Sequence, residues 1–433
     1  MRKMKNSGIP WIGEIPADWS IVKIKAGVYK VGSGKTPSGG ATSYADEGVL
    51  FLRSQNVYDT GLELSNPTYI TPEVDEEMKG TRVFPNDVLL NITGGSIGRC
   101  CIFPEFLETA NVNQHVSIIR VDERVFLPEF MHYYWISPLG AMAINLYQTG
   151  GNREGMSAEA IKNTPIILMP LEEQKRICKV IDAKCAEIDA VLDKTRTSIE
   201  EYKKLKQATI TQAVTKGIRG DRPMKESGIE WAPLISEDWS SHRGKHLFYE
   251  SNERSETGVE ELLTVSHKTG ITPRSQKNVN MFMSESLVGY KVCREGDIAA
   301  NTMWMWQGAI GVSSYRGVIS PSYNTYRQRK GAFDSQYLDY LLRVPPLVEQ
   351  YNVCSTGITA SRLRLYPEQF LSLRFIVPPM EEQQEIVEFL HSRVDEMDAL
   401  IQKKEQFLAE LETYKKSLIY EYVTGKKEVS NAT

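Results

Sequence analysis

The chain has 433 residues, 41% hydrophobic and 24% charged, which is typical of a water-soluble protein of two or three domains. No apolar run approaches the ~20 residues that span a bilayer, the N-terminus lacks the apolar core of a signal peptide, and the six cysteines show no CxxC spacing. These features indicate no membrane-spanning segment, no disulfide framework and no zinc site, and a cytoplasmic location is expected. The net charge of −4 requires any DNA-binding surface to be local.

The chain opens with a stretch that recurs in its second half. Residues 5–20 read KNSGIPWIGEIPADWS, and residues 225–240 read KESGIEWAPLISEDWS. A repeat of this kind indicates a duplicated structural unit.

Each half then predicts the same order of elements. Apolar and β-branched runs between Gly, Pro and Asn turns predict strands. These runs are residues 49–57, 87–93, 98–103 and 114–121 in the first half, and 261–267, 297–303, 309–315 and 323–329 in the second. A short helix, a polar loop and a last strand follow, at 128–137, 148–157 and 165–170, and again at 335–344, 354–364 and 373–379.

Each half ends in a long helix. PLEEQKRI opens the segment 170–217 and PMEEQQEI opens the segment 379–425, and neither contains an internal Pro or Gly. Apolar residues recur at steps of three, four or seven in both, which predicts an apolar seam along each helix. Thr195 and Lys404 interrupt the seams. Two unrelated surface helices are one interpretation, and an antiparallel two-stranded coiled coil is the other.

The sequence therefore predicts an α+β protein with a pseudo-twofold internal repeat. Two β-rich domains are joined and separated by two long helices packed as an antiparallel coiled coil. The predicted boundaries are 1–169 for the first domain, 170–220 for the first helix, 221–378 for the second domain, and 379–433 for the second helix and tail.

Several patterns resemble catalytic motifs and fail on inspection. GSGKT at 32–36 lacks the first glycine of a nucleotide-binding loop, because Tyr29 stands there. His242 and His246 have the spacing of one helix face, but no acidic base lies between them. Glu77 and Lys79 are a common chance pair, and no NPPY-like or GxGxxG sequence is present. We predict no catalytic residues, no metal ligands and no enzymatic activity for this chain.

Polar loops in both halves carry the side chains that read DNA. Arg, Asn and Gln contact base edges, while Lys, Ser, Thr and flexible glycines approach phosphates. For each residue taken singly, an ordinary solvated side chain is the alternative. The candidates are Arg53, Ser54, Gln55, Asn56, Asn113, Gln114, Gly150, Gly151, Asn152 and Arg153 in the first half, and His267, Lys268, Tyr323, Asn324, Gly357, Thr359, Ser361, Arg362 and Arg364 in the second.

Together these stretches resemble the specificity (S) subunit of type I restriction–modification systems. The resemblance covers nearly the whole chain and adds Lys35 and Thr36 to the candidate DNA contacts. It is carried by PLEEQKRI and PMEEQQEI, by SGIPWIGEIPADW and its copy, by GKTPSGG at 34–40, and by the loops TGGNREGMS and STGITASRLR. GKTPSGG has no clear counterpart in the second half, where SNERSETG stands at 251–258.

The resemblance implies two target-recognition domains that each read one half of a bipartite, asymmetric double-stranded DNA site. The helices would set the spacer and dock two methyltransferase (M) subunits, and restriction (R) subunits would join them. S-adenosylmethionine would be bound by M, and ATP and Mg²⁺ used by R, with no cofactor on this chain. A coiled-coil scaffold that binds no nucleic acid is one rival interpretation, and a self-sufficient methyltransferase or nuclease is another.

Overall fold

In the computed structural model, residues 2–148, 155–277, 286–357 and 363–429 are described. The chain forms two compact units, Met1–Arg196 with Gln406–Thr433 (unit 1) and Thr197–Glu405 (unit 2). Across the described ranges, no helix is both long and apolar enough to cross a membrane.

Both units contain the same four-stranded antiparallel sheet. In unit 1 the order is β12 (Cys100–Ile102), β11 (Val88–Asn91), β14 (Val116–Val121) and β4 (Val28–Ser33). In unit 2 the order is β24 (Ile310–Val312), β23 (Ile298–Ala300), β26 (Asn324–Gln328) and β19 (Phe248–Ser251). The sequence repeat is therefore also a repeat of sheet topology.

The remaining strands differ between the units. Unit 1 adds a mixed sheet in which β13 runs parallel to β6; its order is β10 (Arg82–Val83), β13 (Ala110–Val112), β6 (Val49–Leu52), β9 (Tyr69–Ile70) and β5 (Tyr44–Ala45). Unit 2 has instead the hairpin β20 (Leu263–Ser266)–β21 (Gly270–Pro273) and the pair β22 (Lys291–Cys293)–β25 (Gly317–Ile319).

Small strand pairs complete each unit. They are β1 (Met4–Asn6)–β2 (Glu14–Pro16), β3 (Ser20–Lys23)–β15 (Pro165–Leu168) and β7 (Val57–Tyr58)–β8 (Gly61–Leu62) in unit 1, and β16 (Met224–Glu226)–β17 (Leu234–Ser236) and β18 (Ser240–Arg243)–β27 (Arg374–Val377) in unit 2. The first two pairs of unit 1 have counterparts in unit 2, whereas β7–β8 has none within the described residues.

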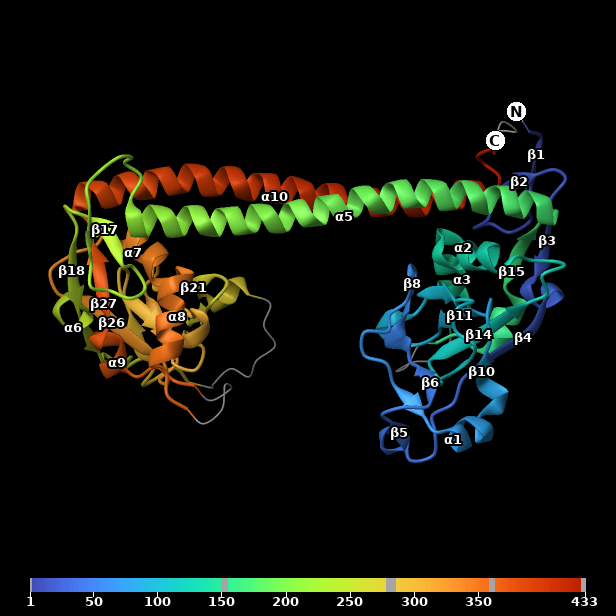
Figure 1. Ribbon diagram of the computed structural model, residues 1–433, viewed down its shortest axis with the longest axis horizontal. Helices are drawn as coiled ribbons and strands as arrows, with labels where there is room; N and C mark the ends of the chain where they lie inside the picture. The colour runs from blue at the N-terminus through green and yellow to red at the C-terminus, as the bar shows by residue number, and fades with distance from the viewer. Residues whose placement is uncertain (1, 149–154, 278–285, 358–362, 430–433) are drawn as a thin grey trace. The chain divides into compact units, whose positions relative to one another are not determined.

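Short helices cover each antiparallel sheet. In unit 1, α2 (Pro128–Ile136) and α3 (Pro138–Tyr147) lie between the strands and the long helix α5 (Figure 1). In unit 2, α7 (Ser335–Leu342) and α8 (Pro345–Cys354) share one core with strands and long helices. The other helices are α1 (Pro72–Glu77), α4 (Ala158–Asn163), α6 (Gly244–Leu247) and α9 (Pro367–Ser372).

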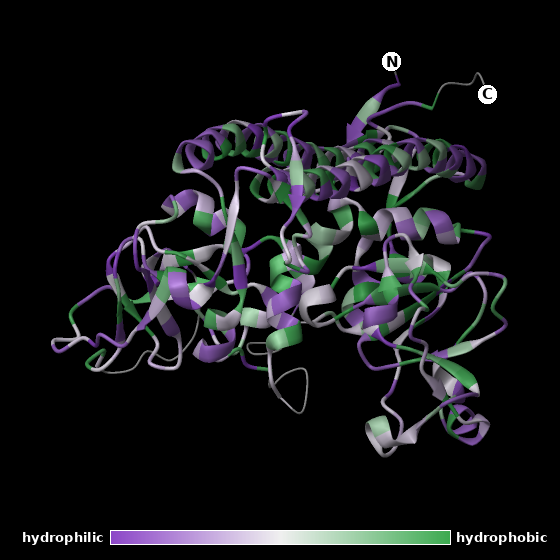
Figure 2. Ribbon diagram, turned by 60° about the vertical axis from the view of Figure 1, so that its left-hand side comes forward, coloured by the Kyte–Doolittle hydropathy of each residue, from purple (hydrophilic) through white to green (hydrophobic). Residues whose placement is uncertain are grey.

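The two long helices, α5 (Leu171–Lys216) and α10 (Met380–Val423), pack antiparallel within each unit. In unit 1, Lys415 Nζ lies 2.7 Å from Asp189 Oδ1, and Arg196 Nη2 lies 2.9 Å from Glu412 Oε1. In unit 2, Lys206 Nζ lies 2.6 Å from Asp398 Oδ2. Figure 2 shows apolar and polar residues in alternating bands along both helices. The α+β fold with its packed helix pair is thus confirmed.

The two interruptions of the seams are accommodated differently. Thr195 is buried, and its hydroxyl donates a hydrogen bond to the Val191 carbonyl, 2.8 Å away in the preceding turn. Lys404 places its ammonium 5.5 Å from the centre of the Tyr202 ring, a cation–π contact within unit 2.

The glutamine of each PxEEQ motif fixes the start of a long helix to its unit. Gln174 Oε1 accepts from Leu127 N (3.0 Å), and its Nε2 donates to the carbonyls of Val125 (2.9 Å) and Met169 (3.1 Å). Both Gln174 and its counterpart Gln383 are fully buried. The repeated glutamine therefore has a structural role, since it satisfies backbone groups that would otherwise be buried without partners.

An arginine, a tryptophan and a glutamate form a second repeated contact. The Arg222 guanidinium lies 5.1 Å from the Trp239 ring centre, and Glu382 accepts from Arg222 Nη1 (2.5 Å) and Trp239 Nε1 (2.8 Å). In unit 1, Arg2 lies 4.9 Å from the Trp19 ring centre and 2.9 Å from Glu173 Oε1. The repeated SGI…DW stretch thus packs against the start of a long helix.

One local prediction was wrong. The run 49–57 is not one strand, because a 3-10 turn at Ser54–Asn56 separates β6 from β7. His242 and His246 lie in different elements, β18 and α6. A second helix, for which no element was predicted, follows each predicted short helix: α3 begins at Pro138, directly after the C-cap residue of α2, and α8 begins at Pro345, two residues after the C-cap residue of α7.

Candidate nucleic-acid interface

In unit 1, the residues that follow β4 make backbone hydrogen bonds to both β13 and β14. Gly34 N donates to the Val116 carbonyl (3.1 Å) and Lys35 N to the Val112 carbonyl (3.2 Å). A β-carbon at Gly34 would collide with the Val112 carbonyl, so only glycine fits there. This close approach brings the exposed side chains of Lys35 and Thr36 to the loop between β13 and β14.

Four polar side chains form a continuous chain at this place. The Thr36 hydroxyl donates to Gln114 Oε1, Gln114 Nε2 lies 3.1 Å from His115 Nε2, and His115 Nδ1 lies 2.6 Å from Thr93 Oγ1. If Gln114 donates to His115 Nε2, the imidazole carries its proton on Nδ1 and donates to Thr93. The loops after β4, β11 and β13 are therefore tied together, and sequence reasoning missed Thr93 and His115.

The polar loop of unit 1, residues 148–157, ends beside this chain of side chains. Thr93 and Gly155 form an isolated antiparallel bridge, and Met156 N donates to the Ile92 carbonyl (3.0 Å). Four candidates in the loop, Gly150, Gly151, Asn152 and Arg153, lie outside the described residues.

The candidates at 53–56 divide into structural and accessible groups. Asn56 is buried and holds the turn, because its Oδ1 accepts from Arg53 N (2.9 Å) and its Nδ2 donates to the Glu63 carbonyl (2.9 Å). Arg53 is half-buried, with Nη2 2.8 Å from Thr68 Oγ1. Gln55 is exposed and Ser54 is half-buried, so these two side chains are the more accessible part of the turn.

Asn113 connects this turn to the polar chain. Its backbone N donates to the Leu52 carbonyl at the end of β6 (3.0 Å), and its Oδ1 accepts from His115 N (3.1 Å). The parallel pairing of β6 and β13 thus places Arg53 and Asn113 after neighbouring strand ends. Candidates separated by 60 residues of sequence are brought together.

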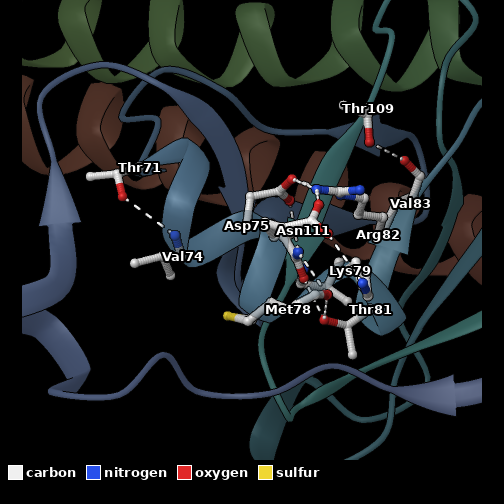
Figure 3. Close-up of polar contacts among 12 residues, drawn as sticks. Thr71, Val74, Asp75, Met78, Lys79, Thr81, Arg82, Val83, Thr109 and Asn111 are labelled. Atoms are coloured by element: carbon white, nitrogen blue, oxygen red, sulfur yellow. Dashed lines mark hydrogen bonds and ion pairs between the residues drawn. The ribbon is translucent and has the colours of Figure 1, made fainter.

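A buried polar cluster joins α1 to strands β10 and β13 of the mixed sheet (Figure 3). Asn111 Nδ2 donates to Asp75 Oδ1 (2.9 Å), the Thr81 hydroxyl donates to Asn111 Oδ1 (2.6 Å), and Arg82 Nε donates to Asp75 Oδ2 (2.6 Å). Asn111 has no exposed surface and sits two residues before Asn113. The cluster therefore fixes β13, and through it the loop that carries Asn113 and Gln114. Asp75 belongs to the acidic run EVDEEMK at residues 73–79.

In unit 2, four of the candidates lie in two places before the second polar loop. His267 and Lys268 are exposed in the turn between β20 and β21, so they do not follow a central strand as Arg53 does. Tyr323 and Asn324 precede and begin β26, where Asn301 Nδ2 lies 2.9 Å from Tyr323 Oη and Lys291 Nζ lies 3.1 Å from Asn324 Oδ1. Asn324 is buried, so its amide orders the site rather than facing solvent.

The second polar loop is closed at its base by backbone hydrogen bonds. Thr356 N donates to the Arg364 carbonyl (2.9 Å), and Arg364 N donates to the Thr356 carbonyl (3.0 Å). Gly357 and the Arg364 side chain are exposed beside this bridge. Thr359, Ser361 and Arg362 lie outside the described residues.

Two arginines are neutralised at matching places beneath the loops. Arg120 forms a two-point contact with buried Asp87, with Nε and Nη2 each 2.7 Å from a carboxylate oxygen. Arg327 contacts Asp297 (2.9 Å) and Glu253 (2.8 Å). Hydrogen bonds from Arg294 and Arg327 lower the pKa of Glu253, which keeps it ionised. The positive charge of Arg327 is therefore compensated by two acids that lie next to the ends of β23 and β19.

Within the described residues, no group of three or more His, Cys, Asp or Glu side chains is arranged so that it could hold a metal ion. The cysteines are free thiols, and burial raises the pKa of Cys101 and of Cys293 to about 12. Such buried thiols are poor nucleophiles.

Two related β-rich units with unlike polar loops, and with the start of a long helix fixed to each, define a duplicated recognition protein. The chain belongs to the family described as the type I restriction modification DNA specificity domain, whose model matches residues 16–201 and 271–410. It is accordingly a DNA-specificity subunit, the non-catalytic component of a type I restriction–modification system.

The chain is similar to known proteins over most of its length. The chain is 22% identical over 438 residues to the type I restriction enzyme MjaVIII specificity subunit of Methanocaldococcus jannaschii, covering 96% of this chain and 95% of that one. A chain from a structural study of complex assembly and conformational transition of the type I R-M system has a TM-score of 0.70 at 17% identity, covering 95% of this chain and 99% of its own. The HsdS subunit from Thermoanaerobacter tengcongensis has a TM-score of 0.51 at 16% identity, covering 95% and 98%. At these identities the structures show a shared fold.

Proposed function

We propose that each unit reads one part of a two-part, asymmetric double-stranded DNA site. The loops after β4, β6, β11 and β13 would contact DNA in unit 1, and the loops before β26, after β23 and around Arg364 would do so in unit 2. In this proposal, exposed Lys35, Gln55 and Gln114 contact the DNA directly, whereas Asn56 and Asn324 hold the loops that do.

One observation carries the proposal: the sheets match and the loops do not. The antiparallel sheets share one strand order, the buried glutamines make equivalent contacts, and an aspartate–arginine pair recurs in each unit. Yet the loop after β11 reads TGGSIG at 93–98, whereas the loop after β23 reads MWMWQG at 303–308. Two units with the same sheet and different loops are what recognition of two different half-sites requires.

The helices are proposed to set the number of base pairs between the half-sites and to bind two copies of the methyltransferase partner. A groove of about 510 Å³ in unit 2 supports this second role. Its lining includes Tyr202, Phe389 and Leu400, and beside them Arg393 and Glu396 form an ion pair of 3.1 Å.

Unit 1 repeats this pattern on the same face of its helix. Val180 and Val191 stand at the places of Phe389 and Leu400, and Lys184 and Glu187 form the matching ion pair at 2.9 Å. Val191 and Leu400 are 42% and 41% exposed, so both apolar faces are open to a partner. Two similar faces suit two copies of one protein. In the assembled enzyme, methyltransferase subunits would bind S-adenosylmethionine, and restriction subunits would use ATP and Mg²⁺.

Mapping of methylated bases in a host that expresses this chain with its cognate methyltransferase tests the proposal. We expect one bipartite motif with two different halves and a fixed spacer. Replacing residues 20–165 with those of a relative should change one half alone. An unchanged motif after that exchange, or no methylation that depends on this chain, would contradict the proposal and favour a scaffold without a role in DNA recognition.

A further inference from the structure

Unit 2 displays an exposed apolar patch with two tryptophans. We define the patch as Met303, Trp304 and Trp306, in the loop after β23. Met303 is 39% exposed and Trp304 is 48% exposed, and the two indole rings stack with centroids 6.3 Å apart and planes 19° from parallel. Exposed tryptophan is costly in water and commonly marks a binding surface.

The loop holds these side chains in a fixed arrangement. Met305 between them is fully buried and anchors the turn in the core. Trp304 N donates to the Asn301 carbonyl (2.9 Å), Ala309 N donates to the Trp304 carbonyl (3.2 Å), and Trp306 Nε1 donates to the Met303 carbonyl (3.0 Å). Gly308 closes the turn at φ +85°, a conformation that favours glycine. The patch is therefore preorganised, which lowers the entropy lost on binding.

The patch is continuous with the candidate interface of unit 2. Asn301 Nδ2 lies 2.9 Å from Tyr323 Oη, and the Thr302 hydroxyl donates to the Ser322 carbonyl at 2.7 Å. These two bonds join the loop to the segment that enters β26. The corresponding loop in unit 1, Thr93–Gly98, is likewise bonded to its neighbour through His115, but it carries glycine and serine in place of the aromatic residues.

We propose that the Met303–Trp304–Trp306 patch reads the C5-methyl group of a thymine in the half-site recognised by unit 2. The thymine methyl is the apolar group that a base pair presents in the major groove, and it is recognised through contact with apolar side chains. The sulfur and ring atoms of the patch offer such contact, whereas the loop of unit 1 has Gly94 and Ser96 at the places of the two tryptophans. The inference rests on the function proposed above and adds a base-edge chemistry to one of the two units.

The test uses the complex of the full chain with its cognate methyltransferase and duplexes that carry the mapped site. Each thymine is replaced in turn by uracil, which removes the methyl group alone. With the wild-type chain we expect one replacement to weaken binding by roughly fourfold, the effect of removing one buried apolar carbon. With Trp304→Ala, binding to the thymine duplex should be weaker and the same replacement should have no effect.

Two further variants separate the contact from effects on folding. Trp304→Phe keeps an exposed ring and should retain part of the sensitivity to uracil. Val259→Ala changes another exposed apolar residue of unit 2, 85% exposed and outside the patch, and should behave as wild type.

The other outcomes overturn the inference. Equal uracil sensitivity in wild type and Trp304→Ala would show that the patch contacts no methyl group. Loss of assembly with the methyltransferase in Trp304→Ala, without any uracil effect in wild type, would make the patch a protein interface. Absence of sequence-specific binding by the wild-type complex would instead reject the proposed function itself.

Discussion

Replacing Gln383 with alanine tests whether the PxEEQ glutamine fixes the helix to its unit. Gln383 Oε1 accepts from Asp334 N (2.8 Å), and Nε2 donates to the carbonyls of Ala332 and Pro378, each at 2.9 Å. The side chain has no exposed surface, so water cannot replace these bonds without a rearrangement. Gln383→Ala removes three hydrogen bonds at once and leaves a cavity.

The expected loss is large for a single substitution. A buried backbone group without a partner costs about 1–3 kcal/mol, and Asp334 N has no other partner among its described hydrogen bonds. The two carbonyls and the cavity add to this cost, so we expect unit 2 to lose about 3–5 kcal/mol. For a unit of this size, that corresponds to a melting temperature lower by roughly 10 °C.

Calorimetry and hydrogen exchange of the full chain provide the measurement. The transition of unit 2 should move down, and the amide of Asp334 should exchange faster than in wild type. Gln384→Ala is the matched control, because the next residue is also glutamine and is exposed. Gln383→Glu keeps the shape but places an acceptor opposite two carbonyls, and should destabilise at least as much.

Two results would refute the reasoning. If Gln383→Ala and Gln384→Ala unfolded within about 1 kcal/mol of each other, the three bonds would contribute little net stability. If the transition moved without faster exchange at Asp334, the loss would come from the cavity rather than from the backbone bonds.

Two other predictions concern the end of α5 and the half-buried His132. Gly217→Ala should destabilise unit 2 by about 1–3 kcal/mol in urea unfolding, because φ is +79° and a β-carbon would collide with the Arg222 guanidinium. Gly220→Ala is the control and should leave the stability unchanged, because no atom lies within 4 Å of the added β-carbon. Equal effects of the two substitutions would contradict the argument. Burial, and then Lys415, lower the pKa of His132 from 6.5 to about 4. Between pH 6.5 and pH 4 the unfolded chain therefore binds a proton that the folded chain does not. The free energy of unfolding has its full value above about pH 6.5 and falls by up to about 3 kcal/mol as the pH approaches 4. His132→Asn should flatten this dependence in unit 1 and exposed His246→Asn should not; an unchanged slope would exclude His132.

The helices were predictable because their signal is local and repeated. Proline opens each helix, glycine ends it, and the apolar spacing between them runs unbroken, so the expected 170–217 and 379–425 nearly match Leu171–Lys216 and Met380–Val423. The presence of two β-rich regions followed from alternating apolar runs in the same way. The predicted domain boundaries remain predictions, since the compact units divide each long helix between them.

The site was less predictable because its contacts are not local. Nothing in the sequence indicates that β13 runs parallel to β6, yet this pairing brings Asn113 beside Arg53. The sequence likewise does not separate a loop asparagine that faces solvent from one that holds the backbone, as Asn56 and Asn324 do. The predicted strand at 297–303 ends at Met303, and no element is predicted for residues 304–308. The exposure of Met303 and Trp304 is therefore seen only in the structure.

The division of each long helix between the units has a consequence for biosynthesis. Unit 2 is one continuous stretch, Thr197–Glu405, whereas unit 1 needs Gln406–Thr433 as well as the first 196 residues. Leu418, Ile419 and Val423 are buried in the unit 1 core, against α5 residues such as Ile181. Domains of a nascent chain usually complete in order from the N-terminus. Here the order is reversed: the ribosome releases everything that unit 2 needs before the last helical turns that close unit 1.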